Sequence, residues 1–336
     1  MRIVSLEEHI SFKEITDSIP KNIGADVGME DSPMMRAIGA KLDDITGERL
    51  KSMNDQGISM QVLSVSGLGA EQMEPAEAPA LATRYNDLVA QRIKDYPDRF
   101  TAFAHLPMTA PAAAADELER MVKTLGFRGA LINGMIRDTF LDDPKFAPIL
   151  KRAEQLGVPI YLHPGLPPKA VQNAYYNDLP KNAGMVLSIA GWGWHSETAL
   201  HILRLILSGT FDKYPALKLI IGHMGEMLPV MMARCDNIFK ANAAGNNQRT
   251  VTETLRQQVH ITTSGIFTQP PLRAAIDTFG IDNIMFSVDY PFSSNEQGRT
   301  FLDSISLPGD QVSKIAHGNA DKLLKLNAAS RKSANV

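Results

Sequence analysis

Short apolar and β-branched runs alternate along the chain with longer amphipathic segments. The apolar runs predict buried strands, and the segments between them predict helices. The predicted strands cover residues 2–9, 58–66, 100–108, 127–134, 158–165, 217–221, 260–266 and 283–291. The predicted helices cover 47–57, 75–96, 111–125, 144–157, 196–209, 226–241, 270–280, a segment around Phe301, and 314–326. This alternation is typical of a parallel α/β protein.

Eight strand-and-helix units favour an α/β fold of the (β/α)8 TIM-barrel class, finished by C-terminal helices. An open doubly wound sheet is the alternative. No Gly-x-Gly-x-x-Gly motif follows the first strand, where a dinucleotide-binding sheet needs one. The 336 residues suit a single barrel domain, 1–336, because such barrels need about 250 residues plus insertions. Two weakly periodic segments, 10–46 after the first strand and 166–195 after the fifth, are predicted to be inserted lid loops.

Composition narrows the class of protein. A hydrophobic content of 44% and a charged content of 21% are ordinary for a soluble protein with a sizeable core. The net charge of −3 offers no electrostatic reason for binding nucleic acid or an anionic membrane. Cys235 is the only cysteine, so an internal disulfide is excluded and a reducing compartment is favoured. Without a signal peptide or a long apolar span, a cytoplasmic protein is expected.

Several predicted strands end on residues that can bind metals or move protons. In a closed barrel the carboxyl ends of the strands surround one mouth, which is where ligands bind. Imidazoles and carboxylates that converge in such a place are the usual ligands of a divalent cation. Strands one, three, five, six and eight contribute, in that order, Glu7 and His9, His105, His163, His223, and Asp289.

The sequence favours a role in the site more strongly for some of these residues than for others. Glu7 and His9 have little structural use at a strand end, and His163 precedes a proline that stops its strand, so all three favour metal ligation. Asp289 ends an apolar strand, where an unpaired carboxylate would be costly, so it favours a site role as well. His223 suits either ligation or proton transfer.

The remaining histidines and the two tryptophans are more ambiguous. His105 suits either a site role or a place lining the mouth. Trp192 and Trp194 suit either the wall of an aromatic pocket or a subunit contact. A purely structural role is expected for the histidines on loops, on helices or at a strand start, namely His195, His201, His260 and His317.

The chain resembles the decarboxylase branch of the amidohydrolase superfamily over nearly its whole length. The likeness is densest in LEEH at residues 6–9, in the long block from SETALHILRLILSG through LKLIIGHMGEMLPVMMARCDN, and in HITTSG, FSVDYPF and HGNADKLLKL. Within that branch it is most similar to gamma-resorcylate and 2,3-dihydroxybenzoate decarboxylases. The branch also includes 5-carboxyvanillate and aminocarboxymuconate semialdehyde decarboxylases.

The resemblance implies one divalent ion, zinc, manganese or magnesium, surrounded by Glu7, His9, His163 and Asp289. It implies that His223 faces Asp289 and is oriented by Glu226, so that these three form the catalytic set. Homodimers or homotetramers are implied as well. Substrate contacts are expected from Arg234, which is implied to lie near the substrate carboxylate and to reach across a subunit interface, and from His105, Tyr290 and Phe292.

Two departures from the binuclear hydrolases of that superfamily favour a single ion. The first strand carries Glu7-x-His9 instead of His-x-His, and Asn133 ends strand four where those enzymes place a bridging lysine. The predicted activity is therefore non-oxidative decarboxylation of an ortho-hydroxybenzoate-type aromatic acid, in which Asp289 protonates the ring carbon before carbon dioxide leaves. A mononuclear hydrolase of a lactone or amide, with metal-activated water, is the alternative. A barrel that has lost its chemistry is a third, less favoured reading.

Overall fold

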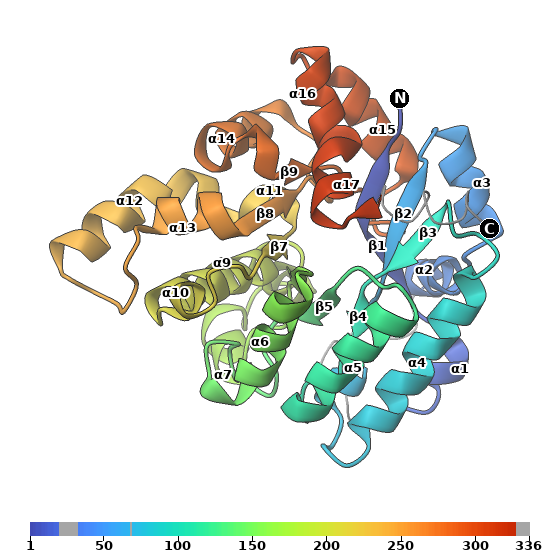
Figure 1. Ribbon diagram of the computed structural model, residues 1–336, viewed down its shortest axis with the longest axis horizontal. Helices are drawn as coiled ribbons and strands as arrows, with labels where there is room; N and C mark the ends of the chain where they lie inside the picture. Colours follow the sequence, from blue (N-terminus) through green and yellow to red (C-terminus); the bar gives the residue numbers. More distant parts are fainter. Residues whose placement is uncertain (20–32, 68, 327–336) are drawn as a thin grey trace.

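The computed structural model describes residues 1–19, 33–67 and 69–326. Its strands are all parallel and run in chain order around a barrel (Figure 1). Their bounds are β1 Val4–Ile10, β2 Met60–Val65, β3 Phe100–Ala102, β4 Ala104–His105, β5 Ala130–Asn133, β6 Ile160–His163, β7 Leu219–Ile221, β8 Val259–Thr262 and β9 Ile284–Met285.

The helices surround this barrel on the outside, with α12 and α13 extending furthest from it (Figure 1). The longer ones are α2 Pro33–Asp43, α3 Glu48–Asp55, α4 Ala78–Ile93, α5 Pro111–Thr124, α6 Ala147–Leu156, α9 Gly193–Leu207, α12 Leu228–Ala241, α13 Val251–Gln258, α14 Gln269–Phe279 and α15 Asn295–Ser304. The short ones are α1 Lys13–Thr16, α7 Lys169–Tyr175, α8 Ala183–Ser188, α10 Thr210–Lys213, α11 His223–Glu226, α16 Gly309–Ser313 and α17 Asn319–Leu323. Shorter turns of other helix types are η2 Ala70–Gln72, η3 Pro144–Phe146, η4 Ile281–Asn283 and η5 Lys314–Gly318.

The third and eighth predicted strands are shorter than the apolar runs indicated. The third is divided at Phe103, whose N–H donates to Leu63 O at 2.9 Å on one side, while the next N–H, of Ala104, turns to Gly129 O at 2.8 Å on the other. The chain after β9 closes the ring through the His9 N–H, which donates to Tyr290 O at 2.7 Å. The eight-unit (β/α)8 barrel predicted from the sequence is confirmed, with β3 and β4 together forming its third strand.

A bulge in β1 decides which of its side chains face the barrel interior. The β1–β2 register moves from Ser5 opposite Gln61 to Glu8 opposite Leu63, so β1 contains one extra residue there. Strict alternation from Leu6, which is packed in the interior, would send Glu8 inward. The bulge reverses this order, and Glu7 contacts Tyr161 of the interior instead. Bulges commonly re-aim side chains beside active sites.

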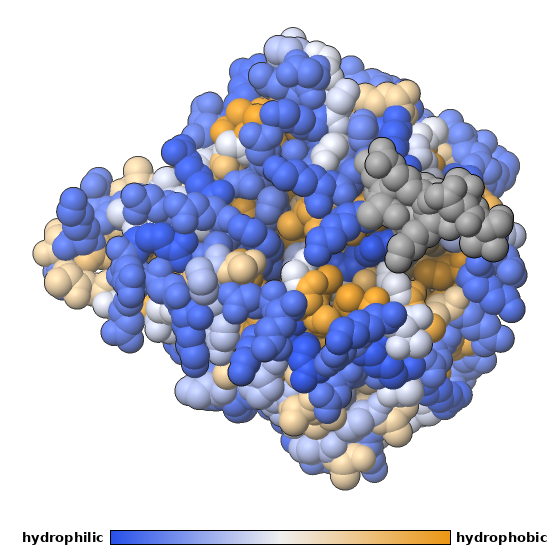
Figure 2. Space-filling model, in the orientation of Figure 1, coloured by the Kyte–Doolittle hydropathy of each residue, from blue (hydrophilic) through white to orange (hydrophobic). Residues whose placement is uncertain are grey.

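The barrel has an inner and an outer core. The inner one contains residues such as Val4, Met60 and Ile220, and the C-terminal segment with Ala320 and Leu324 packs against it near the beginnings of the strands. The outer one lies between strands and helices. The face shown in Figure 2 is mostly hydrophilic, with hydrophobic side chains visible between the helices. Within the described residues, no helix has the length and apolar content needed to cross a bilayer.

The two inserted segments contain more helix than their weak periodicity indicated. Segment 10–46 carries α1 and α2, and residues 20–32 of it lie outside the described part of the chain. Segment 166–195 carries α7, α8 and the first turn of α9. The predicted start of the helix 196–209 is wrong, because α9 begins at Gly193 and the Ser196 hydroxyl donates back to Gly193 O at 2.9 Å.

Candidate metal centre and active site

The two carboxylate oxygens of Glu7 have opposite surroundings. Oε2 accepts hydrogen bonds from the hydroxyls of Tyr161 and Ser264 and, at 3.4 Å, of Thr262. Oε1 is buried and has no hydrogen-bond partner among the described residues. Three hydroxyls therefore hold one oxygen in place and leave the other free to bind something else.

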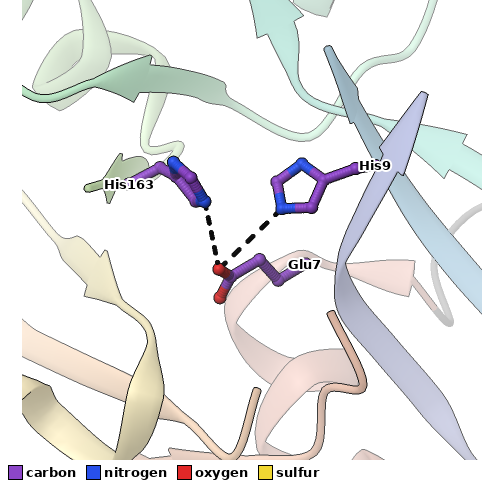
Figure 3. Close-up of side chains that lie close together, drawn as sticks. All are labelled: Glu7, His9 and His163. Carbon is purple, nitrogen blue, oxygen red and sulfur yellow. Dashed lines mark ion pairs between the residues drawn. The ribbon is translucent and has the colours of Figure 1, made fainter. Parts of the chain in front are cut away.

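Three imidazoles lie within 4.0 Å of the free oxygen of Glu7, and two of them, His9 and His163, are drawn in Figure 3. His163 Nε2 lies 3.4 Å and His9 Nε2 4.0 Å from Oε1, as the dashed lines of Figure 3 show. The His163 Nδ1–H donates to Pro164 O at 2.9 Å, which leaves the Nε2 lone pair available. His9 Nε2 is buried and has no hydrogen-bond partner among the described residues. Burial lowers the pKa of both histidines to about 4, so both are neutral at pH 7.

This donor set fits a divalent cation. Glu7, His9 and His163 each offer one ligand atom within 4.8 Å of the others. Two buried polar atoms that lack partners, one of them a carboxylate oxygen, would be costly without an ion. Burial alone would raise the pKa of Glu7, but the surrounding imidazoles and the Ser264 hydroxyl lower it to about 2, so Glu7 is ionised. Nitrogen and oxygen ligands of this kind suit zinc, manganese or magnesium.

Asp289 lies beside His9, in the chain that follows β9. Its Oδ1 is 3.2 Å from His9 Nε2, and its backbone has a φ of 73°. A positive φ at a residue other than glycine is uncommon and is concentrated at functional sites. Burial, together with the Glu7 carboxylate, raises the pKa of Asp289 to about 7, although His223 and His163 act in the other direction. Asp289 can therefore carry a proton near neutral pH.

His223 and Glu226 are placed by a tight turn at the carboxyl end of β7. His223, Met224 and Glu226 have φ values of 48°, 55° and 53°, so three residues other than glycine adopt left-handed conformations in four positions. The turn brings His223 Nδ1 to 2.7 Å from Glu226 Oε1. His223 Nε2 lies 3.6 Å from Glu7 Oε1 and 4.0 Å from Asp289 Oδ2. Burial alone would lower the pKa of His223, but Glu226 and Glu7 raise it to about 10.

The four expected substrate-contact residues have different environments. The Phe292 ring is 47% exposed and its centroid is 5.6 Å from that of His9, so it lies beside the metal cluster. Tyr290 is buried, with the Arg49 guanidinium 4.6 Å from its ring centroid. His105 is also buried, and its Nε2 accepts from the Ala70 N–H at 3.0 Å, which gives it a structural partner.

Arg234 is the fourth of these residues, and it is exposed on α12. Within the described part of the chain, no ion pair or hydrogen bond engages its guanidinium, and the metal cluster does not include it. The α12 side chains one turn before and after it, Val230 and Ile238, are 75% and 40% exposed.

Sequence reasoning missed one member of the site. The sequence predicts a structural role for His195, because it lies on a predicted loop and not at the carboxyl end of a strand. The structure places its Nδ1 2.6 Å from Glu226 Oε2, so Glu226 lies between two imidazoles. Two of the other histidines set aside have hydrogen-bond partners: His201 Nε2 accepts from the Leu141 N–H at 2.8 Å, and His317 Nδ1 lies 3.0 Å from Asp321 Oδ2. The buried Nδ1 of His260 has none among the described residues. No signal in the sequence links His195 to Glu226, since they are separated by 31 positions and lie on different elements.

A parallel barrel with a cluster of carboxylates and imidazoles at the carboxyl ends of its strands has the architecture of a metal-dependent enzyme. The chain belongs to the amidohydrolase family, whose model matches residues 33–326. The fold and the family expected from the sequence are confirmed.

Similar proteins include the gamma-resorcylate decarboxylase of Polaromonas sp., which is 36% identical and aligns over 96% of this chain and 98% of its own length. The crystal structure of a 2,6-dihydroxybenzoate decarboxylase with bound 2,6-dihydroxybenzoate has a TM-score of 0.87 and 35% identity, covering 97% of this chain and 99% of that one. A dihydroxybenzoic acid decarboxylase from Polaromonas sp., solved with manganese and 2-nitroresorcinol, has a TM-score of 0.87 and 34% identity, covering 97% of each chain.

Proposed function

We propose that this protein is a metal-dependent, non-oxidative decarboxylase of an ortho-hydroxybenzoate-type aromatic acid. The observation that carries the proposal is the free Oε1 of Glu7 and the free Nε2 of His9, with Asp289 beside them. The full-length relatives, decarboxylases at 34–36% identity, support the same reaction. The proposal includes a single divalent ion held by Glu7, His9, His163 and Asp289. Manganese is favoured because a relative was solved with it.

The bound ion would supply Lewis-acid chemistry, holding the substrate carboxylate and an ionised ortho-phenol in one orientation. The protein must then deliver a proton, because direct loss of carbon dioxide would leave an aryl carbanion. Asp289 donates this proton to the ring carbon that bears the carboxylate. The carbon–carbon bond then breaks, its electron pair restores the aromatic ring, and carbon dioxide leaves. The product is the corresponding phenol, in which a hydrogen atom replaces the carboxyl group.

His223 and Glu226 support Asp289 in this scheme. His223 Nε2 lies 4.0 Å from Asp289 Oδ2, close enough to re-protonate it after a small side-chain movement. The Glu226 and Glu7 carboxylates, which raise the pKa of His223 to about 10, favour the protonated form. Ligation of a cation by Asp289 would lower the pKa of Asp289 again. Asp289 must therefore be only weakly held when substrate is bound, so that it acts as an acid.

The substrate carboxylate and ring need further partners. Phe292 lies beside His9 and offers an exposed ring for stacking. We also propose that Arg234 completes the site of a second copy of the chain. Arg234 stands between the exposed apolar side chains Val230 and Ile238 on α12, which is the composition of an oligomer interface. If α12 forms such an interface, the protein is a homodimer or a homotetramer.

The test is to load the purified protein with manganese, zinc or magnesium and to screen ortho-hydroxybenzoates. Absorbance reports loss of the acid, and carbon dioxide release is measured in parallel. We expect matched loss and release that a chelator abolishes. Turnover of lactones or amides without carbon dioxide release would favour the hydrolase instead.

The Arg234 proposal has its own test. We expect a dimer or tetramer by light scattering and a large rise in KM in Arg234→Ala. Mixing Arg234→Ala with Asp289→Asn should restore activity in hybrid oligomers if Arg234 acts across the interface. No recovery in hybrids that are shown to form would contradict this role.

A further inference from the structure

The carboxylate of Glu226 is held from both sides by imidazoles. It is 1% exposed. Its Oε1 faces His223 Nδ1 at 2.7 Å, and its Oε2 faces His195 Nδ1 at 2.6 Å. Within the described residues these are its only hydrogen-bond partners. The resemblance and the proposed mechanism give His223 a role, but they give His195 none.

The hydrogen-bond partners of His195 indicate which of its ring nitrogens donate. Its Nε2 lies 3.0 Å from Ala190 O, a carbonyl oxygen that carries no proton, so Nε2 must be the donor. An ionised Glu226 also carries no proton, so Nδ1 must donate as well. Burial would raise the pKa of Glu226, but the charge of His223 and the hydrogen bond from His195 lower it, which agrees with an ionised carboxylate. Both ring nitrogens of His195 therefore face hydrogen-bond acceptors, one on Glu226 and one on Ala190.

The same three side chains also have the composition of a second metal cluster. Their geometry fits hydrogen bonding better. Both carboxylate oxygens already have a nitrogen at 2.6–2.7 Å, the second nitrogen of His195 has the Ala190 carbonyl, and none of these atoms lacks a partner. In the cluster of Glu7, His9 and His163, by contrast, two atoms have no partner.

The position of His195 in the fold connects an insertion to the catalytic turn. His195 stands in the first turn of α9, and Ala190 lies between α8 and α9, within segment 166–195. Glu226 and His223 come from the turn after β7. The neighbouring Trp194 ring lies 6.4 Å from that of His163. Glu226 is thus contacted by the same segment whose Trp194 lies beside His163.

We infer that His195 is a positioning residue of the reaction: it fixes the Glu226 carboxylate, and through it the ring of His223. This inference rests on the proposed decarboxylase activity. A carboxylate with one oxygen unpaired can rotate away from His223 Nδ1, and His223 then presents Nε2 toward Asp289 less often. The loss should appear in kcat, because His195 acts on proton transfer, and leave KM nearly unchanged.

Two substitutions separate the two nitrogens of His195. His195→Asn keeps an amide N–H near the Nδ1 position, facing Glu226, whereas His195→Gln keeps one near Nε2, facing Ala190. We expect kcat to fall about 10- to 100-fold in His195→Gln, as for other residues that orient catalytic groups. In His195→Asn it should fall no more than about threefold. His201→Gln, on the same helix and away from Glu226, serves as the control with wild-type kcat.

A spectroscopic measurement tests the inference independently of activity. In the full protein loaded with diamagnetic zinc or magnesium, histidine ¹⁵N NMR should show both nitrogens of His195 protonated. The Nδ1–H signal should shift in Glu226→Gln. Wild-type kcat in His195→Gln, equal losses in the Asn and Gln variants, or a single protonated nitrogen on His195 would each overturn the inference. If the wild-type protein releases no carbon dioxide, the proposed function fails, and the NMR result alone then decides whether His195 holds Glu226.

Discussion

Replacing Tyr161 by phenylalanine removes one of the three hydroxyls that face Oε2 of Glu7. Tyr161 is fully buried on β6, and its hydroxyl also lies 2.8 Å from Thr262 Oγ1. Burial, together with the Glu7 carboxylate, raises the pKa of Tyr161 well above its usual value, so the hydroxyl keeps its proton and donates to Glu7. In Tyr161→Phe, Glu7 keeps Ser264 and a long contact to Thr262, and the packing of the ring is unchanged.

The expected magnitude follows from this arrangement. A hydrogen bond to a charged group contributes about 1.5–3 kcal/mol. Part of that remains, because the Ser264 hydroxyl still donates to Oε2. The carboxylate is then less firmly oriented toward His9 and His163. Loss of a group that orients a metal ligand typically weakens metal binding by about 10- to 100-fold, which is about 1.4–2.7 kcal/mol.

The assay is competition for zinc or manganese against a chromophoric chelator, with Tyr161→Phe compared with wild type. Tyr214→Phe, which removes a hydroxyl from a tyrosine at the end of α10, is the matched control and should bind metal as wild type does. A dissociation constant within twofold of wild type in Tyr161→Phe would show that the hydroxyl does not orient Glu7. It would also contradict the inference that hydrogen bonds to Oε2 hold Oε1 in position for a cation.

Three further predictions concern other parts of the site. Asp289→Asn should abolish carbon dioxide release and still bind one metal ion per chain by elemental analysis; a variant with most of its activity would remove Asp289 from the role of proton donor. Gly222→Ala should weaken metal binding, because a Cβ there would lie 2.5 Å from Glu7 Oε2, and unchanged chelator competition would contradict this. Glu71 is buried against Asn133, and burial raises its pKa from 4.5 to about 8, although hydrogen bonds from Asn133 lower it in part. Its folded-state pKa exceeds its unfolded one, so its contribution to stability is full below pH 4.5 and is lost as the pH rises to about 8. Denaturant unfolding should therefore show Glu71→Gln gaining on wild type by up to roughly 1.4 kcal/mol per pH unit in this range; a difference that is constant with pH would refute it.

The sequence predicted the parts of the site that follow from strand order. Glu7, His9, His163 and Asp289 each stand at the carboxyl end of an apolar run, and barrel closure brings such ends together. The pattern could not predict where the strands break. The last run, residues 284–288, is apolar apart from Ser287, but only Ile284–Met285 pair as a strand, because the backbone beyond them turns toward β1.

His195 could not be found in this way, for a physical reason. Periodicity reports which face of one element is buried, whereas the contact of His195 with Glu226 joins two elements through hydrogen bonds. The segment before it has Gly191 and Gly193, whose Cβ positions would meet the backbone carbonyl oxygens of Val186 and Ser188 at 2.8 and 2.2 Å. These close approaches shape the entry to α9 and carry no hydrophobic signal. Only the three-dimensional arrangement shows the pairing.

The two adjacent glutamates of β1 show how one extra residue assigns chemistry. Glu8 is fully buried outside the barrel, where it accepts from the Val288 N–H at 3.0 Å and from the Gln61 amide at 3.2 Å. Burial raises its pKa to about 7 despite these hydrogen bonds, whereas the pKa of Glu7 is about 2. Environments that push the pKa values of neighbouring acids apart give them different tasks.

The bulge between Ser5 and Glu8 is what creates this difference. Without it, alternation would turn Glu8 toward the imidazoles and place Glu7 against the helices. Glu8 would then have the surroundings that now lower the pKa of Glu7, and His9, which alternates with Glu8 along the strand, would turn away from the mouth. The chemistry at the mouth of this barrel therefore depends on a backbone irregularity as much as on the identities of its ligands. Such an irregularity, unlike the ligands, leaves no mark in the hydrophobic pattern of the strand.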